Sequence, residues 1–383
     1  MKIAILSRNF DAKGGGAERY AFEVASHLAQ RHEVHVFAQT FGEPVTGVSF
    51  HPLSFSIRRP RWLNQLGFAL ESWLKTRNGF DVVHSHENTW HGQVQTVHVV
   101  PVKSSLLSGL SGWQKYLRFL KIATSPRLIV YWFLEKFRLR ACRNHFVVAV
   151  SKPLAMTIEK SYPDIKHNLK TITPGVHLPQ ETSDKDPSAA RQALSLPKER
   201  RIALFVANDP RRKGLDSILQ AMRLASEEWC LAVAGASHQY ATYQQSVASL
   251  GLGDRVFFLG SLQNISMAYK AANVLLHPTW EDTFAMVVLE AMAHRLPVVV
   301  SAVPYCGISE MLTHQSDALL LDDPGDATQI AAYLNELSDA AELAGSLQKN
   351  GFDFAKAHDW RHVAQRYEAL FLDSANGKEK IAK

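Results

Sequence analysis

Apolar residues occur in two alternating patterns along this chain. The runs from Lys2 to Leu6 and from Val34 to Phe37 are typical of buried strands, whereas apolar side chains between Ala17 and Leu28 recur at helical spacing. This order of strand, helix and strand predicts a parallel α/β sheet. Two further β-branched runs, at residues 80–86 and 145–151, continue the alternation.

The alternation restarts after a polar, proline-containing segment, residues 179–199, which is typical of a linker. Beyond it, strands are expected at 202–207, 230–236, 255–260, 273–278 and 297–301, and helices at 214–225, 265–272 and 285–295. We therefore predict two doubly wound domains, residues 1–175 and 176–357, with ligands at the carboxyl ends of strands facing a cleft. An amphipathic helix at about 358–375 is expected to return to the first domain.

Composition and charge narrow the class of protein. The 383 residues are 46% hydrophobic, which excludes a disordered chain. The net charge of +6 is uneven, because residues 1–170 hold 23 basic and 11 acidic side chains, a net of +12, and the remainder has a net of −6. Three scattered cysteines, Cys142, Cys230 and Cys306, argue against a disulfide framework, and the apolar run from Leu128 to Leu134 is too short to span a membrane. A cytoplasmic protein is expected.

Three segments carry candidate chemistry, the first being the glycine-rich loop before the first helix. Gly14, Gly15 and Gly16 permit a close backbone approach to an anion at the helix start, although a turn without a ligand is equally compatible. Arg19 stands where a GxGxxG motif needs glycine, and no P-loop motif occurs, so a dehydrogenase or a P-loop kinase is disfavoured.

The other two segments lie in the second half. Arg212 and Lys213 follow a predicted strand and can clamp a diphosphate. Further on, Glu290 lies within a helix that is apolar almost all round, so this carboxylate requires a partner or a ligand. The backbone amides of Thr283, Phe284 and Ala285 are expected to face a phosphate at the helix start, where Asp282 can act as a cap.

Together these segments resemble the retaining glycosyltransferases of family 4, which have the two-domain GT-B fold. The resemblance rests on GGGAER, DVVHSHE, TVHVV, AVSKPLA, TPGV, RRKGLD and HPTWEDTFAMVVLEAMAHRLPVV, and it covers nearly the whole chain. The family's motif has two glutamates separated by seven residues. This sequence departs from it, because Asp282 takes the first position, with Glu281 beside it.

The resemblance implies a role for each matched residue. Gly15, Gly16, Arg212 and Lys213 would hold the diphosphate of a nucleotide sugar, with UDP or GDP as the nucleotide. Asp282 or Glu281 would contact sugar hydroxyls, Glu290 the ribose, and His98 the anomeric centre. Leu262 and Gln263 fall where the family holds the nucleobase. No protein nucleophile, cofactor or metal is expected, because the leaving phosphate takes the acceptor proton.

Two metal-like patterns have simpler explanations. Asp184 and Asp186 lie in the linker and are interpreted as solvated charge. His84, His86, Glu87 and His91 offer zinc ligands, but their spacing is not HExxH, and histidines at strand ends explain them better.

Residues 103–143 form a basic, aromatic segment. It holds nine Lys or Arg against one acid, Glu135, interleaved with Trp113, Tyr116, Phe119 and four further aromatic residues. This composition is typical of an interfacial membrane anchor, although solvated helices packed on a sheet remain an alternative. A similar segment marks the lipopolysaccharide core glucosyltransferases, so we expect a glycolipid acceptor, no nucleic acid, and a peripheral position on the inner face of the cell membrane.

Two other functions stay open at this point. A GT-B nucleotide-sugar epimerase would bind the same donor without a lipid acceptor, and a non-enzymatic, membrane-bound module would bind the nucleotide alone.

Overall fold

The computed structural model describes residues 1–107, 109–179, 187–236 and 238–379. Contacts between residues divide the chain into two compact units. Unit 1 is Met1–Gly175 with Trp360–Lys383, and unit 2 is Val176–Asp359. Most of the acidic part of the expected linker, including Asp184 and Asp186, lies outside the described residues.

Unit 1 is built on a seven-stranded parallel sheet in the order β5-β3-β1-β6-β7-β8-β9. Because the chain moves outward from β1 through β3 to β5 and then returns to the other side of β1, the winding direction reverses between β1 and β6. The strands are β1 (Lys2–Leu6), β3 (Glu33–Ala38), β5 (Val48–Pro52), β6 (Val82–Ser85), β7 (Val94–Val97), β8 (Phe146–Ala149) and β9 (Leu169–Thr171); β2 (Asn9–Phe10) and β4 (Thr40–Phe41) form a separate pair.

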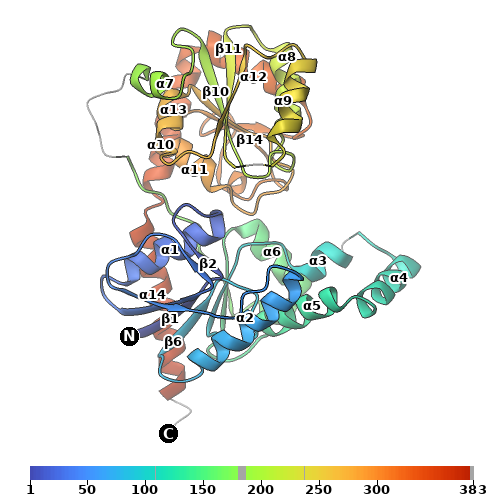
Figure 1. The fold of residues 1–383 in the computed structure, drawn as a ribbon, viewed down its shortest axis with the longest axis vertical. Helices are drawn as coiled ribbons and strands as arrows, with labels where there is room; N and C mark the ends of the chain where they lie inside the picture. The colour runs from blue at the N-terminus through green and yellow to red at the C-terminus, as the bar shows by residue number, and fades with distance from the viewer. Residues whose placement is uncertain (108, 180–186, 237, 380–383) are drawn as a thin grey trace. The chain divides into compact units, whose positions relative to one another are not determined.

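The helices of unit 1 include the last helix of the chain, α14, which packs against α1 (Figure 1). Tyr20 of α1 contacts Trp360 and Tyr367 of α14 edge to face, and all three side chains are buried. Gly175 is required at this junction, since a Cβ there would lie 2.7 Å from the Trp360 nitrogen. The helices are α1 (Gly16–Leu28), α2 (Arg61–Thr76), α3 (Val102–Leu107), α4 (Gly112–Ala123), α5 (Pro126–Arg138), α6 (Lys152–Ser161), the 3-10 turn η1 (Pro163–Ile165) and α14 (Trp360–Glu379).

Unit 2 repeats this plan with a six-stranded parallel sheet in the order β12-β11-β10-β13-β14-β15. Here the winding reverses between β10 and β13. The elements are α7 (Ser188–Ala193), β10 (Arg201–Val206), α8 (Leu215–Leu224), β11 (Trp229–Ala234), α9 (Tyr240–Ser249), β12 (Val256–Gly260), α10 (Ser266–Ala271), β13 (Val274–His277), α11 (Met286–Ala293), β14 (Val298–Ser301), η2 (Ile308–Met311), β15 (Leu319–Leu321), α12 (Ala327–Asp339) and α13 (Ala341–Lys356).

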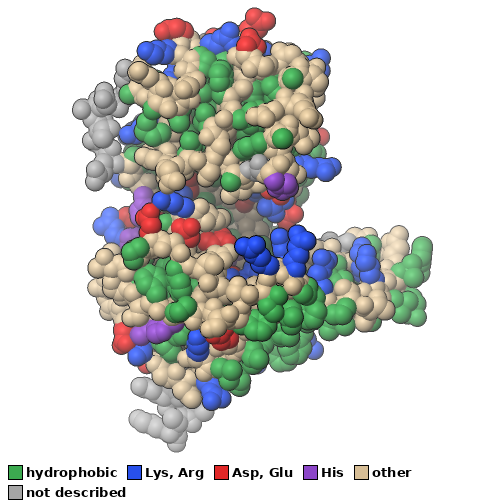
Figure 2. All heavy atoms as spheres, in the orientation of Figure 1, with side chains coloured by type: hydrophobic (Ala, Val, Ile, Leu, Met, Phe, Trp, Pro, Cys, Tyr) green, Lys and Arg blue, Asp and Glu red, His purple; other side chains and the backbone are tan. Residues whose placement is uncertain are grey.

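Helices α4 and α5 extend away from the sheet of unit 1 (Figure 1). Within α4 only Ile122 is buried among the described side chains, whereas Trp113 and Tyr116 are 71% and 66% exposed. Hydrophobic side chains gather over α2, α4 and α5 on the surface of this unit (Figure 2). No described helix combines the length and the apolar character needed to cross a membrane.

The basic segment is less uniform than its composition suggests. Arg138, one of the nine cations expected at a membrane surface, is only 6% exposed, so that expectation is wrong for this residue; Glu135 is also only 6% exposed. The Arg138 guanidinium donates to the Thr96 carbonyl, and Glu135 accepts from the backbone amides of Val102 and Lys103. These two charges join α5 to the sheet and to α3.

Candidate active site

In unit 2, two loops meet where the winding of the sheet reverses. One follows β10 and carries Arg212 and Lys213; the other follows β13 and carries Trp280 and Asp282. The Trp280 amide donates to the Arg212 carbonyl at 3.0 Å. Ligands of doubly wound sheets bind at this position, so the fold itself places these residues at a candidate site.

Lys213, Asp282 and His277 form a compact charged cluster. The Lys213 ammonium donates to Asp282 Oδ2 and to the Glu281 carbonyl, and His277 Nε2 lies 3.2 Å from the same carboxylate oxygen. Burial would raise the pKa of Asp282, but the hydrogen bond from His277 and the charge of Lys213 outweigh it and hold this pKa well below its usual range. Burial lowers the pKa of His277, which favours a neutral ring that donates to Asp282.

Asp282 also binds the loop that leads into α11, and this changes one expectation. Its Oδ1 accepts from the amides of Phe284 and Ala285 at 3.2 and 2.9 Å. The sequence suggested that these amides face a phosphate, but the carboxylate already occupies them. Ala285 itself has a left-handed backbone (φ 74°) and precedes the helix, which begins at Met286.

Glu290 is buried within α11, 8% exposed, as its apolar surroundings require. The Tyr269 hydroxyl donates to Glu290 Oε2 at 2.9 Å, and the Glu290 carbonyl accepts from the His294 amide. A buried carboxylate with a tyrosine partner is held in one orientation, so it can accept hydrogen bonds from a ligand without reorganising.

The remaining candidates of unit 2 lie nearer the surface. Arg212 is about half exposed and pairs with Asp209 at 3.4 Å. Leu262 is partly buried and Gln263 exposed, in the loop after β12.

In unit 1, the glycine loop precedes α1 as expected. Gly15 is the N-cap and Gly16 the first helical residue, and both are exposed. A Cβ on Gly15 would lie 2.7 Å from Glu18 Oε2, so the loop and the first turn are in close contact.

His98 follows β7 at the carboxyl edge of the sheet and lies against His86. His86 Nδ1 and His98 Nε2 are 3.0 Å apart, and the two rings are stacked. Burial, together with the charge of Arg138, lowers the pKa of His98 to about 3. Burial also lowers the pKa of His86, so both rings are neutral near pH 7, and one of them donates to the other.

Behind this pair runs a buried hydrogen-bonded chain. His84 Nε2 is 2.8 Å from Thr96 Oγ1, which contacts the Tyr367 hydroxyl, which in turn contacts Tyr20 at 3.0 Å. The chain links β6, β7, α14 and α1 beneath the histidine pair.

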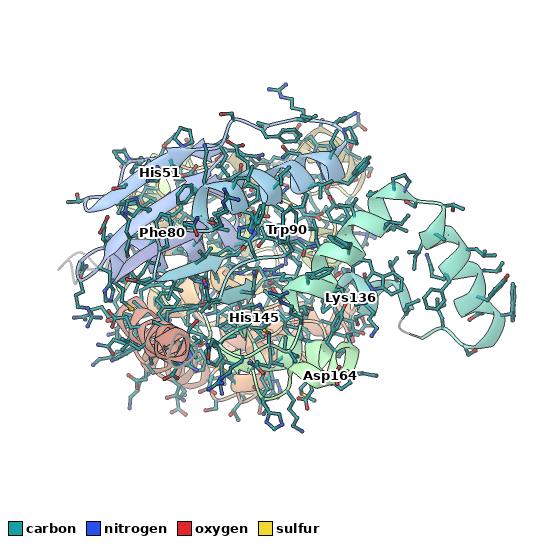
Figure 3. The ribbon with its side chains drawn as sticks, turned by 90° about the horizontal axis from the view of Figure 1, so that it is seen from below. His51, Phe80, Trp90, Lys136, His145 and Asp164 are labelled. Atoms are coloured by element: carbon teal, nitrogen blue, oxygen red, sulfur yellow. The ribbon has the colours of Figure 1, made fainter. Side chains whose placement is uncertain are left out.

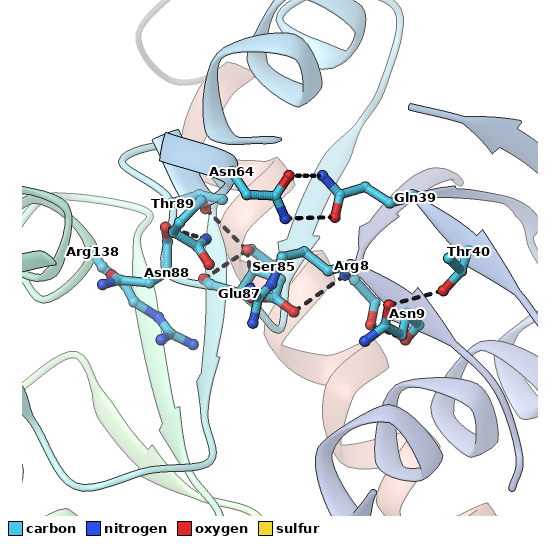
Figure 4. A network of polar contacts seen from close by, with 12 residues as sticks. Arg8, Asn9, Gln39, Thr40, Asn64, Ser85, Glu87, Asn88, Thr89 and Arg138 are labelled. Carbon is cyan, nitrogen blue, oxygen red and sulfur yellow. Dashed lines mark hydrogen bonds and ion pairs between the residues drawn. The ribbon is translucent and has the colours of Figure 1, made fainter. Parts of the chain in front are cut away.

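The histidines offered as zinc ligands have separate partners. His84 pairs with Thr96, His86 with His98, and His91 lies 3.5 Å from the Ser72 hydroxyl. Glu87 instead binds Arg8 at 2.8 Å, in the network of Figure 4, where Ser85 and Thr89 also contact each other. Within the described chain these four residues do not form a group with ligand atoms close together.

Several contributing residues were not singled out in the sequence. His277 and Tyr269 support Asp282 and Glu290, and Tyr20 packs edge to face on His98. Only His277 carried a local signal, because it is a polar residue closing a buried strand. The other two depend on tertiary packing.

Comparisons with known proteins agree with this architecture. Residues 14–180 match the family model Glycosyltransferase Family 4, and residues 186–354 match Glycosyl transferases group 1. The chain belongs to these GT-B glycosyltransferases, as the resemblance of its motifs predicted.

Among curated relatives, the chain is 24% identical to the lipopolysaccharide glucosyltransferase WaaG of Escherichia coli K12, over 61% of this chain and 66% of that protein. It is 26% identical to the lipopolysaccharide core biosynthesis mannosyltransferase LpsB of Rhizobium meliloti, over 88% and 98%. A D-inositol 3-phosphate glycosyltransferase of Corynebacterium aurimucosum aligns at 25% over 61% and 60%. The chain thus spans just under two thirds of WaaG and three fifths of the corynebacterial enzyme.

Solved structures confirm the fold. A crystal structure of WaaG, described as a glycosyltransferase involved in lipopolysaccharide biosynthesis, aligns with a TM-score of 0.83 at 18% identity, over 96% of this chain and 99% of that one. Anabaena Alr3699/HepE in complex with UDP and glucose aligns with a TM-score of 0.74 at 19% identity, over 96% and 98%. Both support the GT-B fold class, with two Rossmann-like domains.

Proposed function

We propose that this protein is a retaining glycosyltransferase that moves a hexose from a UDP-sugar to a membrane-associated saccharide, in the synthesis of lipopolysaccharide core or another cell-surface glycan. The observation that carries the proposal is the Lys213–Asp282 pair at the switch point of the unit 2 sheet. A cation is held there at the carboxyl ends of two central strands, where a diphosphate would bind.

Unit 2 would bind the donor. Lys213 and Arg212 would neutralise the diphosphate, Glu290 would accept hydrogen bonds from the ribose, and Leu262 with Gln263 would border the base. Gly15 and Gly16 of unit 1 would approach the same diphosphate. UDP is favoured over GDP because the similar HepE structures hold UDP and UDP-glucose.

The transfer would proceed at one face of the sugar. The acceptor hydroxyl oxygen bonds to the anomeric carbon as the bond from that carbon to the β-phosphate oxygen breaks, and the hydroxyl proton passes to that phosphate oxygen. Lys213 and Arg212 would stabilise the charge that develops on the phosphate, so neither a protein nucleophile nor a metal ion enters the scheme. Asp282 would hold sugar hydroxyls, and neutral His98 would hydrogen-bond near the anomeric centre.

The acceptor side is supported by the surface of unit 1. Exposed aromatic side chains on α4 and α5 stand beside Arg118, Lys121 and Arg127, which suits the interface of an anionic leaflet. We therefore place the protein at the cytoplasmic face of the membrane, with a glycolipid acceptor.

Donor binding tests the assignment. A panel of UDP- and GDP-sugars is added to the purified protein, and thermal unfolding and release of free sugar are followed. A bound donor at a hundred times its Kd stabilises the native state by about 2.7 kcal/mol. Glu290→Gln and Lys213→Ala are expected to lose most of this stabilisation, whereas the exposed controls Glu228→Gln and Lys349→Ala keep it.

Full donor binding and turnover in both site variants would show that the site is assigned wrongly. Formation of a new sugar nucleotide in the absence of any acceptor would favour the epimerase. Tight nucleotide binding with no sugar release and no transfer to membrane extracts would favour a non-enzymatic module.

A further inference from the structure

Two adjoining hollows lie in unit 1, away from the carboxyl edge of its sheet, where His98 lies. The first, here called the aromatic hollow, has a volume of about 400 Å³. It is lined by Trp73, Trp90, His91, Phe133, Phe137 and Arg140. Its walls come from α2, from the loop between β6 and β7, and from α5 with the residues after it, and Figure 3 labels Trp90 and Lys136 on this side.

The second, here called the arginine hollow, has a volume of about 340 Å³ and shares Trp73, His91 and Arg140 with the first. Arg77, Arg143 and His145 also line it. It lies at the amino ends of β7 and β8, because His91 and Gly92 precede Val94 and His145 precedes Phe146. His98 follows the other end of β7, so this hollow is separate from the carboxyl edge where the catalytic groups lie.

The two hollows differ in their chemistry: mostly aromatic side chains line the aromatic hollow, and three arginines line the arginine hollow. No aspartate or glutamate occurs among the described residues that line either one. The Arg77 guanidinium lies over the Trp73 ring, 5.6 Å from the ring centroid. The ring centroids of Trp73 and Trp90 are 6.5 Å apart. The buried Nδ1 of His91, a residue common to both hollows, has no hydrogen-bond partner within the described chain.

We propose that these hollows hold one anionic phospholipid, with its phosphate between Arg140, Arg77 and Arg143 and one acyl chain in the aromatic hollow. The proposal rests on the membrane association proposed above and deepens it. Guanidinium groups bind phosphate with paired hydrogen bonds, and an aromatic wall suits a hydrocarbon chain.

The surroundings favour a lipid over a free phosphate or a sugar phosphate. A third hollow of about 650 Å³ adjoins at Phe133 and Arg140. Apolar side chains, among them Ile129 and Trp132, line most of it, together with Lys103, Lys136 and Asp164, so apolar surface continues outward from the arginines. Phe133 and Ile129 are 50% and 47% exposed. A small polar anion would leave this apolar surface in water, whereas a lipid covers it.

A lipid held in a site differs measurably from adsorption to a charged surface. Adsorption depends on the number of nearby cations, so removing any one of them weakens it similarly. A site binds one lipid per protein and depends on particular side chains. Arg127, an exposed cation of α5 that lines none of the three hollows, therefore provides a matched control for Arg140.

The full chain is titrated by calorimetry with dihexanoylphosphatidylglycerol below its micelle concentration, with glycerol phosphate, and with dihexanoylphosphatidylcholine. We expect saturable binding of one phosphatidylglycerol per protein. Arg140→Gln and Phe133→Ser should each weaken it about tenfold or more, and Arg127→Gln less than twofold. Both altered side chains are exposed, and unchanged thermal unfolding establishes that the variants fold.

A parallel sedimentation assay uses vesicles of phosphatidylglycerol and phosphatidylcholine at low salt. Vesicle binding that falls equally in Arg140→Gln and Arg127→Gln, without saturable binding of the short-chain lipid, overturns the site but leaves the membrane proposal standing. Glycerol phosphate binding as tightly as the lipid overturns the acyl-chain assignment. Absence of both vesicle and lipid binding rejects the membrane association and the site together.

Discussion

At the scale of single residues, Asp282 has more partners than its place in the sequence suggested. One carboxylate oxygen pairs with Lys213 and His277, and the other accepts from the backbone amides of Phe284 and Ala285, just before α11. The Lys213 ammonium and these two backbone amides are groups expected from the sequence to face a donor phosphate. The carboxylate thus satisfies polar groups that would otherwise be left without partners.

Removing this charge should destabilise unit 2. Asp282→Asn leaves the Lys213 ammonium largely buried without its counter-charge, and loss of such a partner costs about 3 kcal/mol. Urea unfolding at pH 7 measures the change. Asp209→Asn removes an exposed partner of Arg212 and should change stability by less than about 0.5 kcal/mol. Equal losses in the two variants would contradict the buried role of Asp282.

At the scale of elements, the site depends on how the turn before α8 fits against the end of β13. Gly214 has a left-handed backbone (φ 85°), and a Cβ there would lie 2.0 Å from the Pro278 carbonyl oxygen. Only glycine permits both the conformation and this approach, which brings Lys213 next to the loop carrying Asp282.

Gly214→Ala should therefore separate the two loops. We expect a loss of stability of about 3 kcal/mol and weakened donor binding, because a backbone clash adds to the left-handed strain. Gly251→Ala is the matched control, since Gly251 is also left-handed (φ 69°) but has open space around its Cβ position. It should cost about 1 kcal/mol and leave donor binding unchanged in a thermal-shift titration.

At the scale of the whole molecule, the alternation of apolar runs and helical periods predicted the α/β class and the doubly wound sheets correctly. The alternation did not identify strands β5, β7, β9 and β15, nor the two-residue pair β2 and β4. Strands β5 and β9 are only partly buried, β7 carries Gln95 and Thr96, and β15 has three residues, so the apolar signal of each is weak. Among site residues, local patterns identified Lys213 and Glu290. They could not reveal Tyr269 or the His86–His98 contact, which depend on segments 21 and 12 residues apart.

The same limit applies to charge. Counting cations assigned Arg138 to a membrane surface, although its side chain is buried and donates to the Thr96 carbonyl. Helical spacing places Arg127, Leu134 and Arg138 on one face of α5, yet Arg127 is exposed whereas Leu134 and Arg138 are buried, so helical spacing alone does not separate the two arginines.

The stability of unit 1 is sensitive to acid because several of its histidines are buried, which no single motif indicates. Burial lowers the pKa of His84 to about 3, as it does for His98, and lowers that of His91 and His145 to about 4. An unfolded histidine has a pKa of about 6.5, so below that pH the unfolded chain binds protons that the folded unit excludes. The stabilisation is fully present above pH 6.5 and is lost as the pH falls toward 3.

As the pH falls, each such histidine lowers the free energy of unfolding by up to about 1.4 kcal/mol per pH unit. Between pH 6.5 and 5 this amounts to about 2 kcal/mol. His84→Gln removes one of them. The variant is expected to lose about 2 kcal/mol less than the wild type over this interval, although it is less stable at pH 7.5 because the bond to Thr96 is altered. Denaturant unfolding at several pH values separates the two effects, since an altered hydrogen bond shifts the whole curve and a removed proton site changes its slope. Parallel curves for His84→Gln and the wild type would mean that His84 takes up its proton equally in the folded and unfolded chains.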